Sequence, residues 1–290
     1  MRLRSEEILA AENRDLNKLL ASLGPLVELA AAGAAEPSHP APPQERKKQM
    51  AITATKTVRE LAVELPGATR IFEKLGIDYC CGGGKSLQDA CSAARLTVDD
   101  VIRSLELSES ARLAAAPERD WTTAPLSEIT AHIVDKHHAY VRQEIPRIQA
   151  LLAKVVAAHG QNHPEVAKIQ GSFEDLGNEL TPHMFKEENV LFPYIDSMQA
   201  AVERGQPVPP PFFGTVRNPV QMMMTEHDGA GEKLKQMREL SSGYAVPADG
   251  CTTYASLYRA LGEFEQDLHQ HIHLENNILF PRAVELEKRN

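Results

Sequence analysis

Apolar residues recur every three or four positions from about residue 126 to the end of the chain, which is the period of a helix with one buried face. Four such runs follow one another, and their members include Val134, Val141, Ile145, Ile148 and Leu152; Leu176, Leu180, Val190 and Leu191; Val220, Met224 and Leu234; and Leu261, Phe264, Leu268 and Ile278. A proline-rich connection over 203–219 divides the predicted helices into two pairs. Because helices joined by short loops pack antiparallel, the pattern predicts two hairpins that form an antiparallel four-helix bundle.

The second helix of each pair carries nearly the same eleven residues, HMFKEENVLFP at 183–193 and HIHLENNILFP at 271–281. Their shared pattern is His-x3-Glu-x-Asn-[Val/Ile]-Leu-Phe-Pro. Residues four apart lie on one face of a helix, so each box places an imidazole beside a carboxylate. The first helix of each pair adds a histidine at a matching distance, since His138 precedes His183 by 45 residues and His227 precedes His271 by 44.

Six polar residues therefore fall on the apolar stripes of one bundle: His138, His183, Glu187, His227, His271 and Glu275. A charge that is buried without a partner costs several kcal/mol, a large share of the roughly 5–15 kcal/mol that keeps a domain folded. Two divalent cations would compensate the two carboxylates, and carboxylate with imidazole suits iron, manganese or zinc. We predict the histidines as terminal ligands and the glutamates as bridges. The alternative is a hydrogen-bonded polar network, which repetition of the whole box disfavours.

Other polar residues near the boxes are given different roles. His137 has a mixed set of helical neighbours, so His138 is the preferred ligand. Three histidines off the stripes are expected at the surface or behind a ligand, and three more fall in predicted loops: His132, His269 and His273, and His39, His159 and His163. Glu188 is expected to be a solvated charge, with orientation of a ligand as the alternative.

Residues 53–108 predict a small helical domain, in which Thr57 and Glu60 form a capping box at the start of the first helix. About 55 residues make only a marginal core. We therefore expect this domain to dock on something rather than to stand alone.

A glycine-rich loop within that domain, Asp78–Lys85, carries the adjacent cysteines Cys80 and Cys81. Their Cα atoms are about 3.8 Å apart, which is too close for an unstrained disulfide. The three glycines predict an exposed, flexible loop, and Lys85 is placed to lower a thiol pKa. We interpret the pair as a redox-active or metal-transferring dithiol, with inert loop cysteines as the alternative.

Composition narrows the class of protein. The formal net charge of -9 argues against binding to nucleic acid, whose phosphates need clustered Lys and Arg. No apolar run reaches the roughly 18 residues of a membrane span. Four cysteines in 290 residues are not a disulfide framework, so we expect a cytoplasmic protein with reduced thiols, in which Cys91 and Cys251 are structural.

These features predict four regions. Residues 1–52 form a poorly ordered N-terminal arm and linker, because an Ala/Gly stretch is followed by a Pro-rich segment. Residues 53–108 form the small helical domain, 109–125 a linker and 126–290 the bundle. The predicted fold class is all-α. The role of residues 1–49, and whether Met50 is the true start, stay open.

The same residues resemble those of a known family, the di-iron iron–sulfur cluster repair proteins of the ScdA/YtfE type (repair of iron centres). Asp78–Gly83 resembles the signature of the family's short N-terminal ScdA-type domain, and the two repeated boxes resemble its hemerythrin-like ligand sequences. Glu226–Glu232 is similar to the motif around a further ligand, His227, while the sequence around His138 departs from the family pattern. The resemblance covers about residues 57–284.

This resemblance implies a hemerythrin-like bundle that holds two iron ions in a non-haem di-iron centre, preceded by an ScdA_N-type domain. It also implies a role in oxidative and nitrosative stress, in which iron is donated to partner proteins with damaged iron–sulfur clusters. Two other classes stay open: a hemerythrin-like protein that binds or senses O2 or NO, and an enzyme that reduces NO or peroxide with Cys80 and Cys81 as electron relay. Enzyme status, the client proteins and formation of a homodimer are left open by the sequence.

Overall fold

The computed structural model describes residues 52–65, 67–113, 119–208 and 210–288. The arm predicted for residues 1–52, including His39, lies outside these ranges apart from Ile52. Within them all regular secondary structure is helical, and the sole β interaction is an isolated antiparallel bridge between Thr57 and Ser86. The predicted all-α class is confirmed.

The small helical unit contains α3 (Val58–Glu64), α4 (Ala68–Leu75), α5 (Leu87–Ala93) and α6 (Val98–Leu113). Its short helices begin and end at clear local signals. Thr57 and Glu60 form the predicted capping box, in which each side chain accepts a hydrogen bond from the backbone N–H of the other. Gly76 ends α4 with φ 66°, a left-handed conformation that other residues rarely adopt. Ser86 then caps α5 by accepting from the backbone N–H of Asp89.

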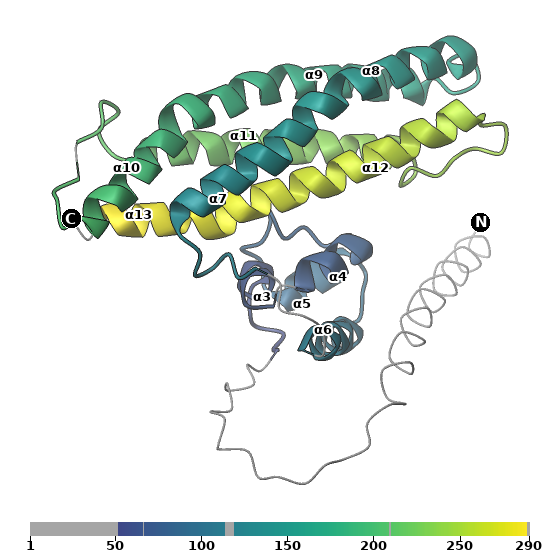
Figure 1. The fold of residues 1–290 in the computed structure, drawn as a ribbon. Coiled ribbons are helices and arrows are strands. Elements are labelled where there is room, and N and C mark those ends of the chain that lie inside the picture. Colours follow the sequence, from purple (N-terminus) through teal and green to yellow (C-terminus); the bar gives the residue numbers. More distant parts are fainter. Residues whose placement is uncertain (1–51, 66, 114–118, 209, 289–290) are drawn as a thin grey trace, which may run out of the picture. The chain divides into compact units, whose positions relative to one another are not determined.

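Four long helical segments make up the bundle (Figure 1). The first segment is α7 (Leu126–His132), η1 (Ile133–His138) and α8 (Ala139–His159), and the second is α9 (Glu165–Lys186), η2 (Glu187–Leu191) and α10 (Phe192–Glu203). The third is α11 (Arg217–Leu240), and the fourth is α12 (Thr252–His273), η3 (Leu274–Leu279) and α13 (Phe280–Lys288). The first, second and fourth segments each contain a short π-helical stretch, η1, η2 or η3. A π turn inserts one extra residue, and such turns are frequent at functional sites. His138, Glu187 and Glu275 lie in these three stretches.

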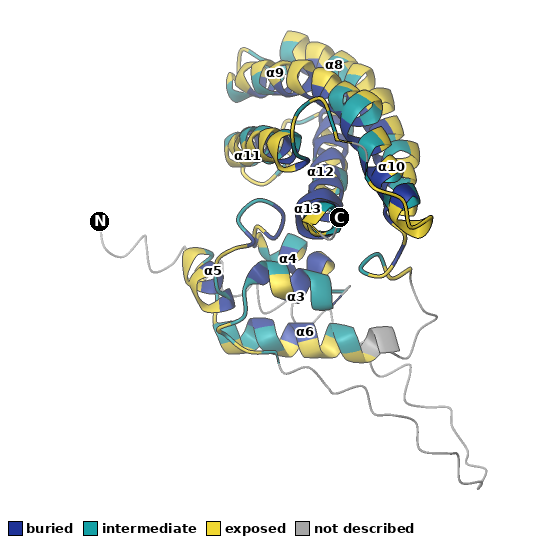
Figure 2. Cartoon of the chain, turned by 90° about the vertical axis from the view of Figure 1, so that its left-hand side faces the viewer, coloured by how far each residue is buried: buried dark blue, intermediate teal, exposed yellow. Residues whose placement is uncertain are grey.

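The bundle buries its apolar stripes in two clusters. α9 packs on both α8 and α11, and α12 packs on α8, whereas α11 and α12 contact each other less closely. Figure 2 shows the buried residues of these helices turned toward the inside of the bundle and the exposed residues on its outer faces. One cluster includes Val141, Leu180, Leu234 and Leu268, and the other includes Ile133, Leu191, Met223 and Leu279. The predicted metal-binding residues fall between the two.

The small helical unit docks on the bundle, as its marginal core predicted. Asn277 Nδ2 in η3 donates a hydrogen bond to the backbone oxygen of Tyr79 (3.0 Å), and Gln270 Nε2 donates to the Tyr79 hydroxyl (2.8 Å). Glu73 of α4 accepts from His269 Nδ1 at 2.9 Å. None of the described helices is long and apolar enough to cross a bilayer.

Candidate metal centre

Six polar side chains meet between the two apolar clusters, and we call them the His/Glu cluster: His138, His183, Glu187, His227, His271 and Glu275. Each is at most 2% exposed. They form two groups of four that share both glutamates: His138, Glu187, His271 and Glu275; and His183, Glu187, His227 and Glu275. Within each group the potential ligand atoms lie within 4.8 Å of one another. The structure therefore brings together all six residues that the sequence singled out.

The four imidazoles meet in pairs. His138 Nε2 is 3.2 Å from His271 Nε2, and His183 Nε2 is 3.1 Å from His227 Nε2. Each pair joins one histidine from the first hairpin and one from the second, so neither hairpin alone completes a group.

The two carboxylates lie between the imidazole pairs. Glu187 Oε2 is 3.4 Å from His138 Nε2 and 3.3 Å from His183 Nε2. Glu275 uses both oxygens and places one at 3.1 Å from each of the other two imidazoles. Each carboxylate thus faces both pairs, which is the placement of a bridging group.

The second ring nitrogen of three imidazoles has a fixed acceptor, in the pairs His138–Glu188 (2.6 Å), His183–Glu226 (2.7 Å) and His227–Asn276 (2.9 Å). Arg142 binds Glu188 and Lys186 binds Glu226, so both carboxylates are balanced by a cation on their outer side. An acceptor at Nδ1 keeps the proton on that nitrogen, which leaves Nε2 with a free lone pair. Those lone pairs point into the His/Glu cluster.

While the imidazoles are neutral, the inward-facing atoms cannot all satisfy one another. With protons only on their Nδ1 atoms, the 3.1 Å contact between His183 and His227 joins two acceptors. Both oxygens of Glu187, Oε2 of Glu275 and Nδ1 of His271 have no hydrogen-bond partner among the described residues. A buried polar group without a partner costs about 1–3 kcal/mol, and more when it is charged.

A cation in each group of four would remove this conflict. Two nitrogen ligands at about 2.1 Å from one ion are about 3 Å apart, which matches the spacing of the imidazole pairs. Imidazole and carboxylate together form a donor set that first-row metals favour. The residues present therefore fit an iron-binding site.

The electrostatics of the cluster lead to the same expectation. Burial lowers the pKa of His183, but the charge of Glu187 outweighs burial and raises it to about 9. Burial and the charge of Glu275 raise the pKa of Glu187, yet His183 and His138 hold it below its usual value. Ionised carboxylates in a water-poor layer attract positive charge, either as protons on the imidazoles or as metal ions.

Comparison with known proteins agrees with this geometry. The model of the hemerythrin HHE cation binding domain matches residues 130–283, and the ScdA_N model, described as a domain of unknown function, matches residues 54–109. The chain is 36% identical over 227 residues to the iron-sulfur cluster repair protein YtfE of Pectobacterium atrosepticum, which covers 78% of this chain and 95% of that protein. The chain belongs to the iron–sulfur cluster repair protein family. It is also 38% identical over 227 residues to the YtfE protein of Citrobacter koseri, with 78% and 94% covered. Identity to a probable iron-sulfur cluster repair protein of Haemophilus influenzae is 34% over 231 residues, with 80% and 97% covered.

In this member of the iron–sulfur cluster repair family, the expected solvated charge at Glu188 is wrong. Its carboxylate accepts from His138, which is the alternative role. The sequence did not identify Glu226 and Asn276 as the hydrogen-bond acceptors of His183 and His227. The repeat does contain a signal for Asn276. Asn276 follows Glu275 as Glu188 follows Glu187, so the two residues occupy the same position of the box.

His137 is not on a mixed outer face but is 1% exposed. It lies in the π turn η1, whose extra residue lets two consecutive side chains face inward. Its Nδ1 contacts Asp267 at 3.0 Å, and its ring stacks on His271 at 5.6 Å. It occupies the position equivalent to Glu226, immediately before the first histidine of its hairpin. Glu226 accepts from His183, so the equivalent residue His137 faces His271. Because residue 137 is not a carboxylate, Nδ1 of His271 has no acceptor in the described part of the chain.

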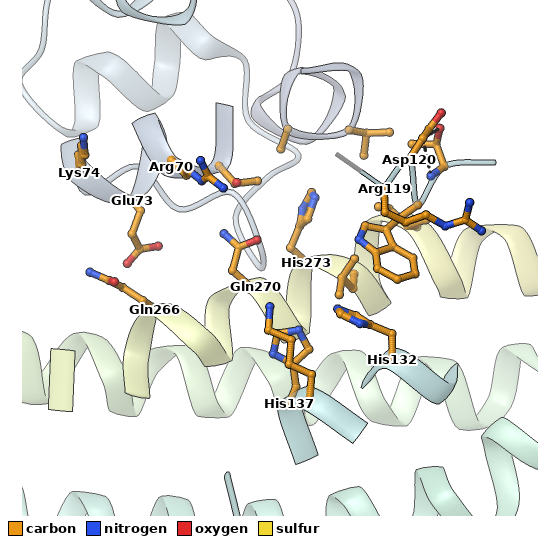
Figure 3. Close-up of a pocket in the computed structure, with 18 residues that line it drawn as sticks. Arg70, Glu73, Lys74, Arg119, Asp120, His132, His137, Gln266, Gln270 and His273 are labelled. Carbon is orange, nitrogen blue, oxygen red and sulfur yellow. Dashed lines mark hydrogen bonds between the residues drawn. The ribbon is translucent and has the colours of Figure 1, made fainter. Parts of the chain in front are cut away.

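His137, His132 and His273 line a cavity of about 560 Å³ between the small helical unit and the bundle (Figure 3). His273 is buried rather than at the surface, and its Nδ1 accepts from Asn277 Nδ2 at 2.8 Å. Burial lowers the pKa of His273 to about 4, so the ring is neutral. Its ring packs edge-on against Tyr79 of the small unit at 5.5 Å, and none of the three histidines belongs to the His/Glu cluster.

The thiol loop, Asp78–Gly82, is not the exposed loop that its glycines predicted. Asp78 holds the backbone N–H groups of Cys80, Cys81 and Gly82 at 3.1, 3.0 and 2.9 Å. The Cys80 side chain is buried. A hydrogen bond to Cys81, burial and the Asp78 charge raise the pKa of the Cys80 thiol well above its usual value, so the lowering expected from Lys85 is wrong for Cys80.

The thiol loop does lie beside the His/Glu cluster. Cys81 Sγ is 3.6 Å from the backbone oxygen of His227, where the sulfur faces α11. A side-chain carbon at Gly231 would come within 3.4 Å of this sulfur. A glycine one turn beyond His227 therefore leaves room for the thiol at the seam between α11 and α12.

The other two cysteines differ from each other. Cys91 is buried in the small helical unit, as expected. Cys251 is exposed at the N-terminus of α12, with its sulfur 3.2 Å from His159 Nε2. A backbone N–H of Tyr254 and the ring of His159 lower the pKa of this thiol to about 7. The structural role expected for Cys251 stays a prediction.

Proposed function

We propose that this protein holds two iron ions in the His/Glu cluster and donates iron to proteins whose iron–sulfur clusters have been damaged by oxidative or nitrosative stress. The observation that carries the proposal is the pair of overlapping groups of four, in which both oxygens of Glu187 and one oxygen of Glu275 have no hydrogen-bond partner in the described part of the chain. Relatives that carry the name of iron-sulfur cluster repair proteins match almost their whole length. Iron supplies a cation of the charge and donor preference that this layer requires.

The residues of this chain have separable roles in the proposal. Glu187 and Glu275 would hold both ions together, and the four imidazoles would complete their coordination. Glu188 and Glu226 accept hydrogen bonds from Nδ1 of His138 and His183. They thereby strengthen Nε2 of these two rings as a metal ligand. The other two imidazoles have a neutral acceptor or none, so each ion would have one strongly and one weakly supported histidine.

The thiol loop supplies a route by which iron would leave. Cys80 and Cys81 line a cavity of about 540 Å³ together with Asp228 and Glu232 of α11. Cys81, one of the residues that line this cavity, also contacts the backbone of His227 through its sulfur. A thiolate is a good ligand for iron, so the pair is placed to accept an ion from the His183–His227 group and to pass it to a client.

A reconstituted repair assay tests the proposal. Iron-loaded protein is mixed with a dehydratase whose cluster has been damaged, and recovery of dehydratase activity is followed without free iron. We expect recovery with wild-type protein and none with the iron-free protein. The Cys80→Ser/Cys81→Ser variant should bind the same amount of iron but repair poorly, and Cys91→Ser serves as a buried cysteine control. Absence of recovery by the iron-loaded wild type would contradict the proposal.

The two alternatives predict different behaviour in the same preparation. A carrier or sensor would bind O2 or NO reversibly, with a stable spectrum and no iron loss. A reductase would consume NO or peroxide over many turnovers when a reductant is supplied. A fifth ligand histidine would favour the carrier, but His137 stacks on His271 and lies outside both groups of four.

A further inference from the structure

Asn276 makes two hydrogen bonds with different parts of the molecule from one side-chain amide. Its Oδ1 is 2.9 Å from His227 Nδ1, and its Nδ2 donates to the backbone oxygen of Cys80 at 3.3 Å. A carbonyl oxygen only accepts, so the NH2 group must face Cys80 and the amide oxygen must face His227. This orientation also fixes the proton of His227 on Nδ1. Asn276 is 3% exposed, so no bulk water replaces either bond.

Comparison of the two hairpins shows why an amide at this position is notable. The equivalent residue in the first hairpin is Glu188, which holds His138 at 2.6 Å and is balanced by Arg142 at the surface. A carboxylate supports an imidazole ligand better than an amide does. The second hairpin therefore has the weaker acceptor. What the amide adds is a donor, and this donor is directed at the thiol loop.

Two further contacts link the same loop to the same histidine. Cys81 Sγ lies 3.6 Å from the backbone oxygen of His227. Next to Asn276, Asn277 donates to the backbone oxygen of Tyr79 at 3.0 Å but does not contact the His/Glu cluster. The loop is thus held at two consecutive carbonyl groups, and only the Asn276 bond continues to a candidate ligand.

We propose that Asn276 is a positioning residue that couples the thiol loop to His227, so that displacement of the loop loosens iron held by the His183–His227 group. The proposal rests on the proposed iron-binding function and adds which ion leaves first and what controls its release. When the loop moves away, the Asn276 amide loses its Cys80 acceptor and is free to turn, and His227 then loses its fixed Nδ1 partner. An ion in the other group would be held by His138 and His271, neither of which bonds to Asn276, so it should stay bound longer.

Coupling of this kind must act in both directions. If a docked loop favours iron, then bound iron must favour the docked loop. Iron loading should therefore slow the reaction of Cys81 with a thiol reagent, and labelling of Cys81 should speed the capture of iron by a chelator. Both rates are measured on full-length protein, and neither requires a repair client or an activity.

Three variants separate the two bonds. Asn276→Leu removes both, and we expect iron affinity to fall by about 10–100-fold, the usual effect of losing a residue that orients a ligand. Asn276→Asp keeps an acceptor for His227 but loses the donor to Cys80, so the thiols should react faster while iron is held at least as tightly as in wild type. Asn277→Asp is the matched control, because the two bonds that it loses, to the backbone oxygen of Tyr79 and to His273 Nδ1, do not reach the cluster. It should speed thiol labelling, while the dependence of the labelling rate on iron, which acts through Asn276, is kept.

The decisive quantity is the ratio of the Cys81 labelling rates without and with iron. In wild type this ratio should be well above one, and in Asn276→Leu it should approach one. An equal ratio in both proteins would overturn the proposal. So would a wild-type ratio of one, which needs no variant and therefore holds even if Asn276→Leu fails to fold. If wild type binds no iron at all, the proposed function fails; if it binds iron and repairs clusters without this coupling, only the inference about Asn276 fails.

Discussion

Replacing Glu187 by leucine should lower the stability of the metal-free protein and destroy the metal site. Glu187 is fully buried, and its Oε2 lies 3.3 Å from His183 Nε2 and 3.4 Å from His138 Nε2. Burial lowers the pKa of His183, but the charge of Glu187 raises it to about 9, so a protonated imidazole balances this carboxylate in the metal-free state. Removal of one partner from a buried pair costs about 3–5 kcal/mol, because the other charge is left without compensation.

The measurement is thermal unfolding of chelator-treated protein together with iron analysis after anaerobic reconstitution. Each kcal/mol that is lost should lower Tm by about 2–4 °C for a domain of this size. The helical circular dichroism spectrum should be unchanged, and the iron content should fall to less than half of the wild-type value. Glu265→Leu is the control, because Glu265 is also buried and is bound by Arg238 at 3.0 Å but lies outside the His/Glu cluster. Its loss should lower stability by about 1–3 kcal/mol and leave the iron content unchanged.

Two results would refute this reasoning. If metal-free Glu187→Leu were at least as stable as metal-free wild type, protonated imidazoles would not balance the Glu187 charge in the metal-free state. If the variant kept the full amount of iron, Glu187 would not be a ligand.

Three further predictions concern residues around the cluster. Glu188→Gln should lower iron affinity by about 10–100-fold, measured by chelator competition, whereas Glu179→Gln at the exposed Lys233 pair should leave it unchanged; equal effects would mean that Glu188 does not act through His138. Gly83→Val should expose the thiol loop to labelling reagents, because a side-chain carbon at residue 83 would lie 2.8 Å from the backbone oxygen of Tyr79, while Gly84→Val, which has open space, should not. Alkylation of Cys251 should accelerate as pH rises through about 7, where its thiol loses the proton, and His159→Ala should move this midpoint upward; a midpoint that stays in place would exclude His159 as a cause.

The repeat made the His/Glu cluster predictable. Two boxes of the same pattern, at matching distances from His138 and His227, predicted that these residues lie at the same level of the bundle. Helical periodicity predicted that every member of the His/Glu cluster faces the core. The π turns could not be seen in this way, because an apolar stripe that continues through an extra residue still reads as a helix. That extra residue is why His137 is buried beside His138. In α11, which has no π turn, Met223 rather than Met224 lies in the core.

The partners of the imidazoles were harder to predict, because they come from neighbouring helices. Glu226 precedes His227 in the sequence but binds His183 on another helix. The thiol loop was misjudged for a similar reason. Its glycines suggested exposure, whereas its position is set by Asp78 within the loop and by two asparagines that lie about 200 residues further along. Contacts that depend on tertiary packing have no local signal in a single sequence.

Iron content per chain tests the central claim most directly, when it is measured after anaerobic reconstitution of wild type and of two double variants. His183→Ala/His227→Ala removes both histidines of one group of four, and His138→Ala/His271→Ala removes those of the other. We predict about two iron ions in wild type and no more than one in either double variant, with the helical spectrum retained. Wild-type protein without iron, or double variants that still bind two, would contradict the claim that these six side chains form a dinuclear site.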